Sequence, residues 1–157
     1  MEMKQYLIET FRYNDYANHQ ILESIQAAPD KKELIRFFSH LINSQKKWMV
    51  RILEYPHSTE MSWWDPVYPL ENLEKEWTKS LQTWIHFLES KTEEQLSEYV
   101  FYAGYDGGKW TARLQDIALQ LNYHSIHHRA QIQAMLRAQG VEPKFVDYIG
   151  TVYKKIE

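Results

Sequence analysis

The segment LQDIALQLNYHSIHHRAQIQAML (Leu114–Leu136) decides the fold, because its apolar residues recur every three or four positions. On a helix these residues form one stripe, made of Leu114, Ile117, Ala118, Leu121, Ile132, Met135 and Leu136. His124 and His128 are one turn apart and lie in this stripe or at its edge, whereas His127 points away from it. The pattern predicts a long amphipathic helix that presents two imidazoles to the core.

Two imidazoles on the core side of a helix need partners. A buried polar group without a hydrogen bond or ligand costs about 1–3 kcal/mol, and no Asp or Glu accompanies His124 and His128 on their face of the helix. A His-x-x-x-His pair can hold one metal ion between its two rings. The competing interpretation is a chance pair, since the chain has seven histidines.

Three more helices follow from the same periodicity. The first is expected over residues 3–27 and the second from Lys32 to Tyr55. The third is expected over residues 70–90, on Leu73, Trp77, Leu81, Trp84 and Leu88. The fourth, over residues 111–139, should end at Gly140. The prediction is an all-α four-helix bundle, in which sites form between facing helices.

Two connections interrupt the helical pattern. Residues 56–70 contain three prolines and should form a long loop. Three aromatic residues of this loop, Trp63, Trp64 and Tyr68, have two possible roles. They either form the wall of an apolar substrate pocket or cap the end of the bundle. Between the third and fourth helices, the stretch YVFYAGYDGGKW (residues 99–110) alternates around Asp106-Gly107-Gly108, which predicts a short β-hairpin or an extended excursion.

Composition limits the class of protein. A length of 157 residues suits a single domain over 1–157. The formal charge of −3 provides no basic surface for nucleic acid, and the absence of a long apolar run predicts a cytoplasmic protein without membrane segments. The chain has no cysteine, which excludes disulfides, thiolate ligands and a protein thiol nucleophile. Any thiol chemistry must therefore use a thiol from the substrate.

A third imidazole for the pair could come from the second helix. His40 lies off the middle of its apolar stripe, on the side of Ser44, so it would have to face a groove between helices. Three histidines would bind a divalent ion and leave one coordination position open. The other histidines, His19, His57 and His86, are expected at the surface. The metalloprotease motif His-Glu-x-x-His does not occur.

Several motifs together resemble the DinB/YfiT family of metal-binding four-helix bundles. These are HLINSQKKW (residues 40–48), HSIHHRAQI (124–132), YNDYANHQIL (13–22) and PKFVDYI (143–149), which extend over nearly the whole chain in order. The resemblance implies a tri-histidine site of His40, His124 and His128 for a divalent metal such as zinc or nickel. By the same resemblance, His127 and Arg129 are adjacent to the motif but are not ligands.

The resemblance also implies a class of chemistry, since some members are transferases or isomerases that use a low-molecular-weight thiol such as bacillithiol. Three functions stay open for this chain: a metal-dependent thiol transferase acting on small electrophiles, a metal-dependent hydrolase, and a non-catalytic metal-binding or interaction bundle. Asn14 and Asn18 either orient a ligand or stabilise the first helix. A homodimer formed by helix faces is expected from the resemblance and from the apolar surface that Trp77 and Trp84 of the third helix would expose.

Overall fold

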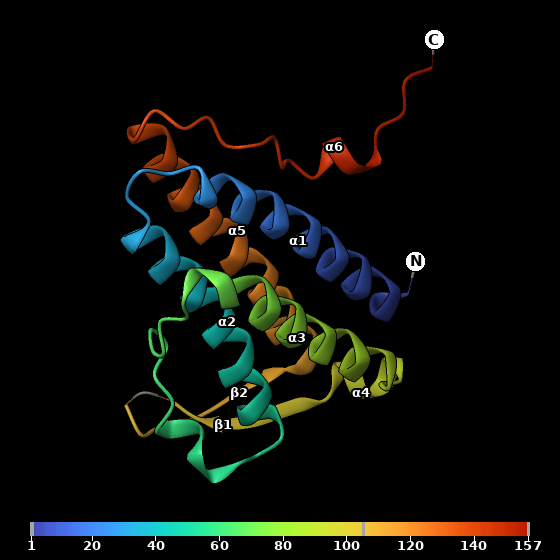
Figure 1. Cartoon of the computed structure of the whole chain (residues 1–157). Helices are drawn as coiled ribbons and strands as arrows, with labels where there is room; N and C mark the ends of the chain where they lie inside the picture. Colours follow the sequence, from blue (N-terminus) through green and yellow to red (C-terminus); the bar gives the residue numbers. More distant parts are fainter. Residues whose placement is uncertain (1, 105, 157) are drawn as a thin grey trace.

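Four long helices form the bundle in the computed structural model, which describes residues 2–104 and 106–156. They are α1 (Met3–Gln26), α2 (Lys32–Ile52), α3 (Leu70–Glu89) and α5 (Leu114–Ala138). Each of α1 and α2 packs against both α3 and α5 (Figure 1). The predicted all-α bundle is therefore confirmed, and its four helices lie close to the predicted ranges.

Two helix ends differ from the prediction. The second helix stops at Ile52 rather than Tyr55, and Glu54 then adopts a left-handed backbone with φ of 57°. The fourth begins at Leu114 rather than at 111, because residues 111–113 belong to a β-strand. The C-terminus of α2 and the N-terminus of α5 both lie at the end of the bundle that carries the hairpin (Figure 1).

The core is filled by the apolar stripes that the sequence indicates. All five predicted core residues of α3 are buried, and Trp77 and Trp84 are completely inaccessible to solvent. Their indole N–H groups donate to Asp15 and to the backbone carbonyl of Gln45. The expectation that these tryptophans expose apolar surface for a dimer is therefore wrong, because the indoles fill the space between α3 and its neighbours.

The connection between α3 and α5 contains the predicted hairpin. Strands β1 (Tyr99–Ala103) and β2 (Lys109–Arg113) pair antiparallel, with Tyr99 opposite Arg113 and Ala103 opposite Lys109. Gly107, at φ of 75°, supplies the turn conformation that other residues rarely adopt; Tyr105 lies outside the described residues. The short helix α4 (Glu93–Ser97) precedes the hairpin and was not predicted, although Thr92 and Gln95 form a capping box.

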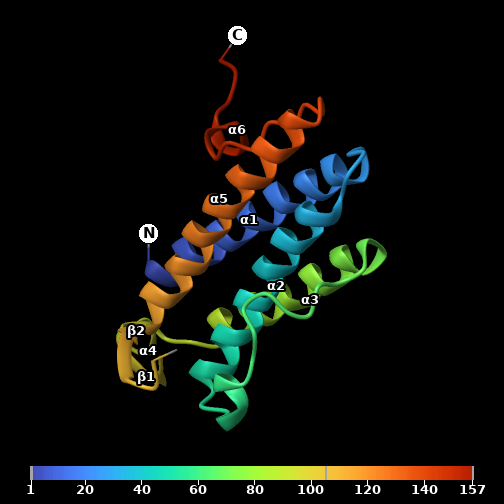
Figure 2. The same cartoon turned by 90° about the vertical axis from the view of Figure 1, so that its left-hand side faces the viewer.

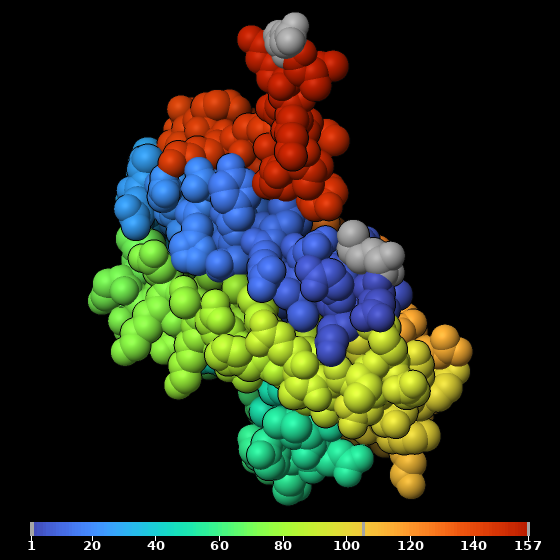
Figure 3. Space-filling model, turned by 90° about the vertical axis from the view of Figure 1, so that its right-hand side faces the viewer, coloured from blue at the N-terminus to red at the C-terminus, as the bar shows by residue number. Residues whose placement is uncertain are grey.

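The two remaining segments run alongside helices, the loop along α2 and the C-terminal segment along α1 (Figure 1). The loop after α2 includes a short 3-10 helix, η1 (Pro56–Thr59), and returns along α2 to Leu70 (Figure 2). The C-terminal segment passes α1, where Tyr13 donates to the Val146 carbonyl, and includes the short helix α6 (Ile149–Val152). It then extends away from the bundle (Figures 1 and 3). None of the described helices is long and apolar enough to cross a membrane.

Candidate metal centre

Three imidazoles from two helices meet in one group. His40 comes from α2, and His124 and His128 come from successive turns of α5. One ring nitrogen from each lies within 4.8 Å of the other two, and the Nε2 atoms of His40 and His124 are 2.9 Å apart. The structure thus brings together the three residues that the sequence motifs single out.

The position of His40 follows the prediction for its face of α2. Its side chain is 5% exposed, in the groove between α2 and α5, and Ser44 one turn later lies 3.4 Å from His124 Nε2. A position off the centre of the apolar stripe faces the boundary between two packed helices. This is where an imidazole from α2 can reach the pair on α5.

Hydrogen bonds fix the tautomers of two rings. His40 Nδ1 lies 2.7 Å from the backbone carbonyl of Trp63, and His128 Nδ1 lies 2.6 Å from Gln131 Oε1. An oxygen of this kind only accepts, so each Nδ1 carries the proton and each neutral ring keeps a lone pair on Nε2. Histidine ligands of metals commonly donate their second ring N–H to such an oxygen.

The environment keeps the three rings neutral. Burial lowers the pKa of His124 to about 4, with further lowering by the charges of His128, His40 and His127. Burial is also the main cause that lowers the pKa values of His40 and His128. Neutral imidazole is the form that donates a lone pair to a metal, so this environment favours ligation at neutral pH.

An aromatic wall borders the histidines. The Trp64 ring stacks on His40 with 3.9 Å between centroids, and Phe37 packs edge-on against His128. Beside them, a pocket of about 230 Å³ includes His40 and His124 as well as Trp48 and Trp63. Of the three aromatic loop residues considered as pocket walls, Trp63 and Trp64 therefore lie at the site.

Tyr68, the third of these residues, lies elsewhere. Its hydroxyl accepts from Lys46, and its backbone N–H donates to Ser39. Tyr68 thus ties the end of the loop to α2 and takes no part in the wall beside the histidines.

The remaining histidines lie outside the group, although the His127 ring packs edge-on against His128 with 4.9 Å between centroids. His57 and His86 are exposed, as predicted, and His19 is half-buried beside Asp15 on α1. His127 is also exposed, which agrees with its position off the stripe. Its charge nevertheless contributes to the lowered pKa values of His124 and His128.

Arg129 has a structural role next to the motif. Its guanidinium donates to Asn14 Oδ1 and Asn18 Oδ1, both at 2.9 Å, and the side chain is 2% exposed. Among the described residues no carboxylate forms an ion pair with it. The Oδ1 atoms of Asn14 and Asn18 therefore join α1 to α5 by accepting from a buried cation, which favours the structural alternative for these two oxygens.

The donor set fits a divalent transition metal. Two nitrogens at about 2.1 Å from one tetrahedral ion lie roughly 3.4 Å apart, and the three ring nitrogens already lie within 4.8 Å of one another. Nitrogen ligands suit zinc and nickel better than magnesium or calcium, which prefer oxygen. In the described part of the chain, the group contains three histidines and no carboxylate.

Two contributors to the site were not predicted. Gln131 lies three residues after His128, a spacing that places it within reach on a helix, so the sequence contained this signal. The Trp63 carbonyl is a backbone group of a loop 23 residues after His40. No side-chain pattern could have indicated it, because its position depends on the path of the loop.

Comparison with known proteins identifies the family of the chain. No curated protein matches the sequence. The sequence does match the DinB family over residues 1–157, which is the whole chain. With a helical bundle and a tri-histidine group that could hold a metal ion, the chain belongs to the DinB family.

Proposed function

We propose that the protein is a metal-dependent transferase that joins a low-molecular-weight thiol to a small electrophile. The observation that carries the proposal is the convergence of His40, His124 and His128 beside a pocket. A divalent ion held there, zinc or nickel, would lower the pKa of a coordinated thiol and make its thiolate available at neutral pH.

The protein's own side chains would hold and orient the reactants. His40 and His128 each direct an Nε2 lone pair into the group because their Nδ1 protons are engaged. Trp48 and Trp63 give the adjacent pocket an apolar wall for the electrophile. In the reaction, the thiolate sulfur forms a bond to the electrophilic carbon, the leaving group departs with its bonding electrons, and the thiol proton passes to solvent.

Two other functions use the same site differently. In a hydrolase, water would replace the thiol as the nucleophile. A nearby carboxylate would assist such a reaction as general base, yet the described group contains none. In a non-catalytic bundle, the histidines would bind a metal without turnover. The absence of a carboxylate favours the transferase over the hydrolase.

Metal content tests the site itself. We expect about one zinc or nickel ion per chain after reconstitution, and its loss in the His124→Ala/His128→Ala double variant. His127→Ala is the matched control, because His127 is adjacent and exposed but lies outside the group. Equal metal content in the wild type and the double variant would show that the site is wrong.

Turnover tests the reaction. Metal-loaded protein would be assayed with bacillithiol, glutathione or buffer alone against a panel of alkyl halides, epoxides and esters. The transferase requires turnover that depends on thiol and metal and is lost in His128→Ala but kept in His127→Ala. Thiol-independent ester cleavage would indicate the hydrolase, and metal binding without any turnover would indicate the non-catalytic bundle.

We also propose that the protein is a homodimer joined through its C-terminal segment. This segment extends from the bundle with apolar side chains exposed: Ile149 is 59%, Tyr153 is 64% and Ile156 is 91% accessible (Figure 3). Exposed apolar side chains of this kind are stabilised by packing on a second copy.

Light scattering tests the dimer. The mass of wild type should be about twice the 19.0 kDa of one chain. The triple variant Val152→Ser, Tyr153→Ser, Ile156→Ser should be a monomer, whereas Leu53→Ser, an exposed position after α2, should stay dimeric. A monomeric wild type at tens of micromolar would exclude the proposal.

A further inference from the structure

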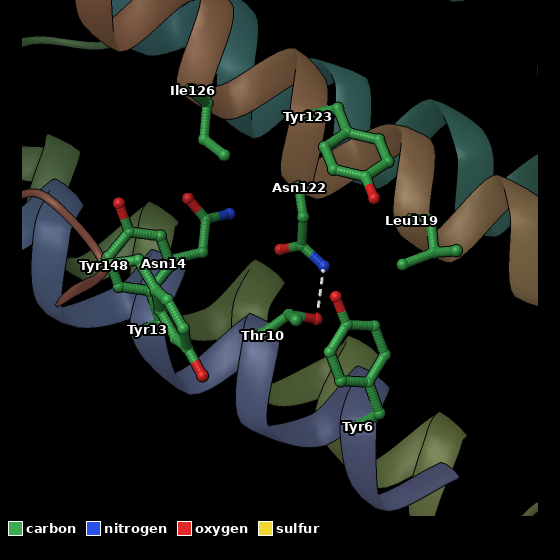
Figure 4. Close-up of a pocket in the computed structure, with 9 residues that line it drawn as sticks. All are labelled: Tyr6, Thr10, Tyr13, Asn14, Leu119, Asn122, Tyr123, Ile126 and Tyr148. Atoms are coloured by element: carbon green, nitrogen blue, oxygen red, sulfur yellow. Dashed lines mark hydrogen bonds between the residues drawn. The ribbon is translucent and has the colours of Figure 1, made fainter. Parts of the chain in front are cut away.

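A second pocket lies between α1 and α5, away from the histidines. It has a volume of about 160 Å³ and shares no lining residue with the pocket at His40 and His124. Tyrosines from α1, α5 and the C-terminal segment surround it, together with Leu119 and Ile126 (Figure 4). The pocket thus combines aromatic walls with a small interior.

Two buried polar atoms at this pocket have no hydrogen-bond partner among residues 2–104 and 106–156. They are Asn14 Nδ2, a donor from α1, and Asn122 Oδ1, an acceptor from α5. The two side chains are 1% and 6% exposed, and their amides point into the space between the helices (Figure 4). An unsatisfied buried polar atom costs about 1–3 kcal/mol, so both atoms favour a ligand that supplies the missing partners.

Neighbouring groups fix the orientation of each amide. Asn14 Oδ1 accepts from Arg129, which can only donate, so Nδ2 is the free atom of Asn14. Asn122 Nδ2 donates to the backbone carbonyl of Ala118, which can only accept, so Oδ1 is the free atom of Asn122. If the nitrogen and oxygen of either amide were exchanged, two donors would face each other at Asn14 and two acceptors would face each other at Asn122. The site therefore requires one acceptor and one donor from its occupant.

We propose that this pocket binds a small, neutral, planar molecule with a carbonyl beside an N–H, such as an aromatic primary amide or a ring lactam. The carbonyl of the ligand would accept from Asn14 Nδ2, and its N–H would donate to Asn122 Oδ1. A cavity of about 150 Å³ holds one benzene ring, so the volume suits a single ring. One water occupies only about 30 Å³ and would leave most of the apolar wall uncovered.

Three isosteric probes, all of which keep an acceptor oxygen, test the requirement for an N–H donor in the ligand. Benzamide supplies both groups, acetophenone replaces the N–H with a methyl group, and benzoate supplies two acceptors and a negative charge. Titration by NMR should show benzamide binding about tenfold more tightly than acetophenone, since one buried hydrogen bond is lost. Benzoate should bind more weakly than benzamide, because it places an acceptor against Asn122 Oδ1.

Two variants connect the preference to the pocket. Asn122→Leu should remove the preference for benzamide over acetophenone. Ile126→Trp fills the pocket from a 45% exposed position and should abolish binding of all three probes, whereas Leu53→Trp at an equally exposed position should not. Equal affinities for the three probes, tighter benzoate binding, absence of any binding, or a preference retained in Asn122→Leu would overturn the proposal.

Discussion

At the scale of single residues, Gln131 decides which nitrogen of His128 is available. Its Oε1 accepts from His128 Nδ1 at 2.6 Å, so the lone pair of that ring lies on Nε2. The Trp63 carbonyl has the same effect on His40. The donor set thus depends on oxygens that would never touch the metal.

The role of Gln131 gives a testable prediction. Replacing Gln131 by Leu removes the acceptor and leaves His128 free to change tautomer. We expect metal affinity to fall about 10- to 100-fold, measured by competition with a chelator. Gln133→Leu on the same helix is the control, because the Gln133 side chain makes no hydrogen bond in the described part of the chain. An unchanged affinity in Gln131→Leu would show that the bond does not orient the ligand.

The lowered pKa of His124 predicts how stability depends on pH. Burial, followed by the charges of His128 and His40, lowers this pKa to about 4, while an unfolded histidine titrates near pH 6.5. Between these values the unfolded chain binds a proton that the folded protein does not. The free energy of unfolding must therefore decrease as the pH falls through this window.

Urea unfolding of metal-free protein at pH 7 and pH 5 measures this dependence. We expect wild type to lose more stability on acidification than His124→Gln. His57→Gln, which changes an exposed histidine, should behave as wild type. The same loss in His124→Gln as in wild type would mean that other groups control the response to acid.

At the scale of elements, the loop between α2 and α3 completes the site. Trp64 stacks on His40, and the guanidinium of Arg36 lies 4.4 Å from the centre of the same indole. The Trp63 carbonyl in the same loop accepts from His40. The loop and the site therefore support each other, because an imidazole from α2 receives its stacking partner and its acceptor from one segment.

Loss of the Trp64 ring should affect both the loop and the metal. In Trp64→Ala we expect faster limited proteolysis within residues 53–69, because the loop loses its aromatic anchor, and weaker metal binding, because His40 loses its support. Mass spectrometry of the fragments locates the cleavage. Tyr55→Ala, at a 50% exposed position of the same loop, should leave both properties unchanged. Wild-type cleavage rates in Trp64→Ala would contradict the prediction.

At the scale of the whole molecule, the bundle does not need a metal to hold its helices together. The core is continuous across all four long helices and includes large side chains that are fully buried, such as Phe11, Phe38, Trp77 and Trp84. Apolar burial stabilises the folded state by about 25 cal/mol per Å². Most of this surface belongs to residues other than the three histidines.

Removal of metal should therefore leave the fold intact. We expect chelated protein to keep most of its helical circular dichroism at 222 nm and to unfold cooperatively, unlike a zinc finger, which unfolds without its metal. Metal should raise the melting temperature only through the free energy of binding. Loss of most of the helical signal on chelation would show that the core is insufficient alone.

The sequence by itself determined the helices and the placement of two of the three histidines. Periods of three and four residues placed all four long helices, and the spacing of His124 and His128 placed both rings on the core side of α5. These features are local, because side chains three or four residues apart are neighbours on any helix. The glycines after Asp106 similarly predicted the hairpin, whereas α4, with only five residues, has too little periodicity to stand out.

Only the tertiary structure decided which surfaces meet. It placed His40 within 2.9 Å of His124, supplied the Trp63 carbonyl, and buried Trp77 and Trp84 between helices. A helical period shows which face of a helix is apolar, but it does not show which neighbour covers that face or how a loop returns to it. Those outcomes depend on packing between residues distant in the sequence, and for that reason the third histidine needed the bundle to reach the other two.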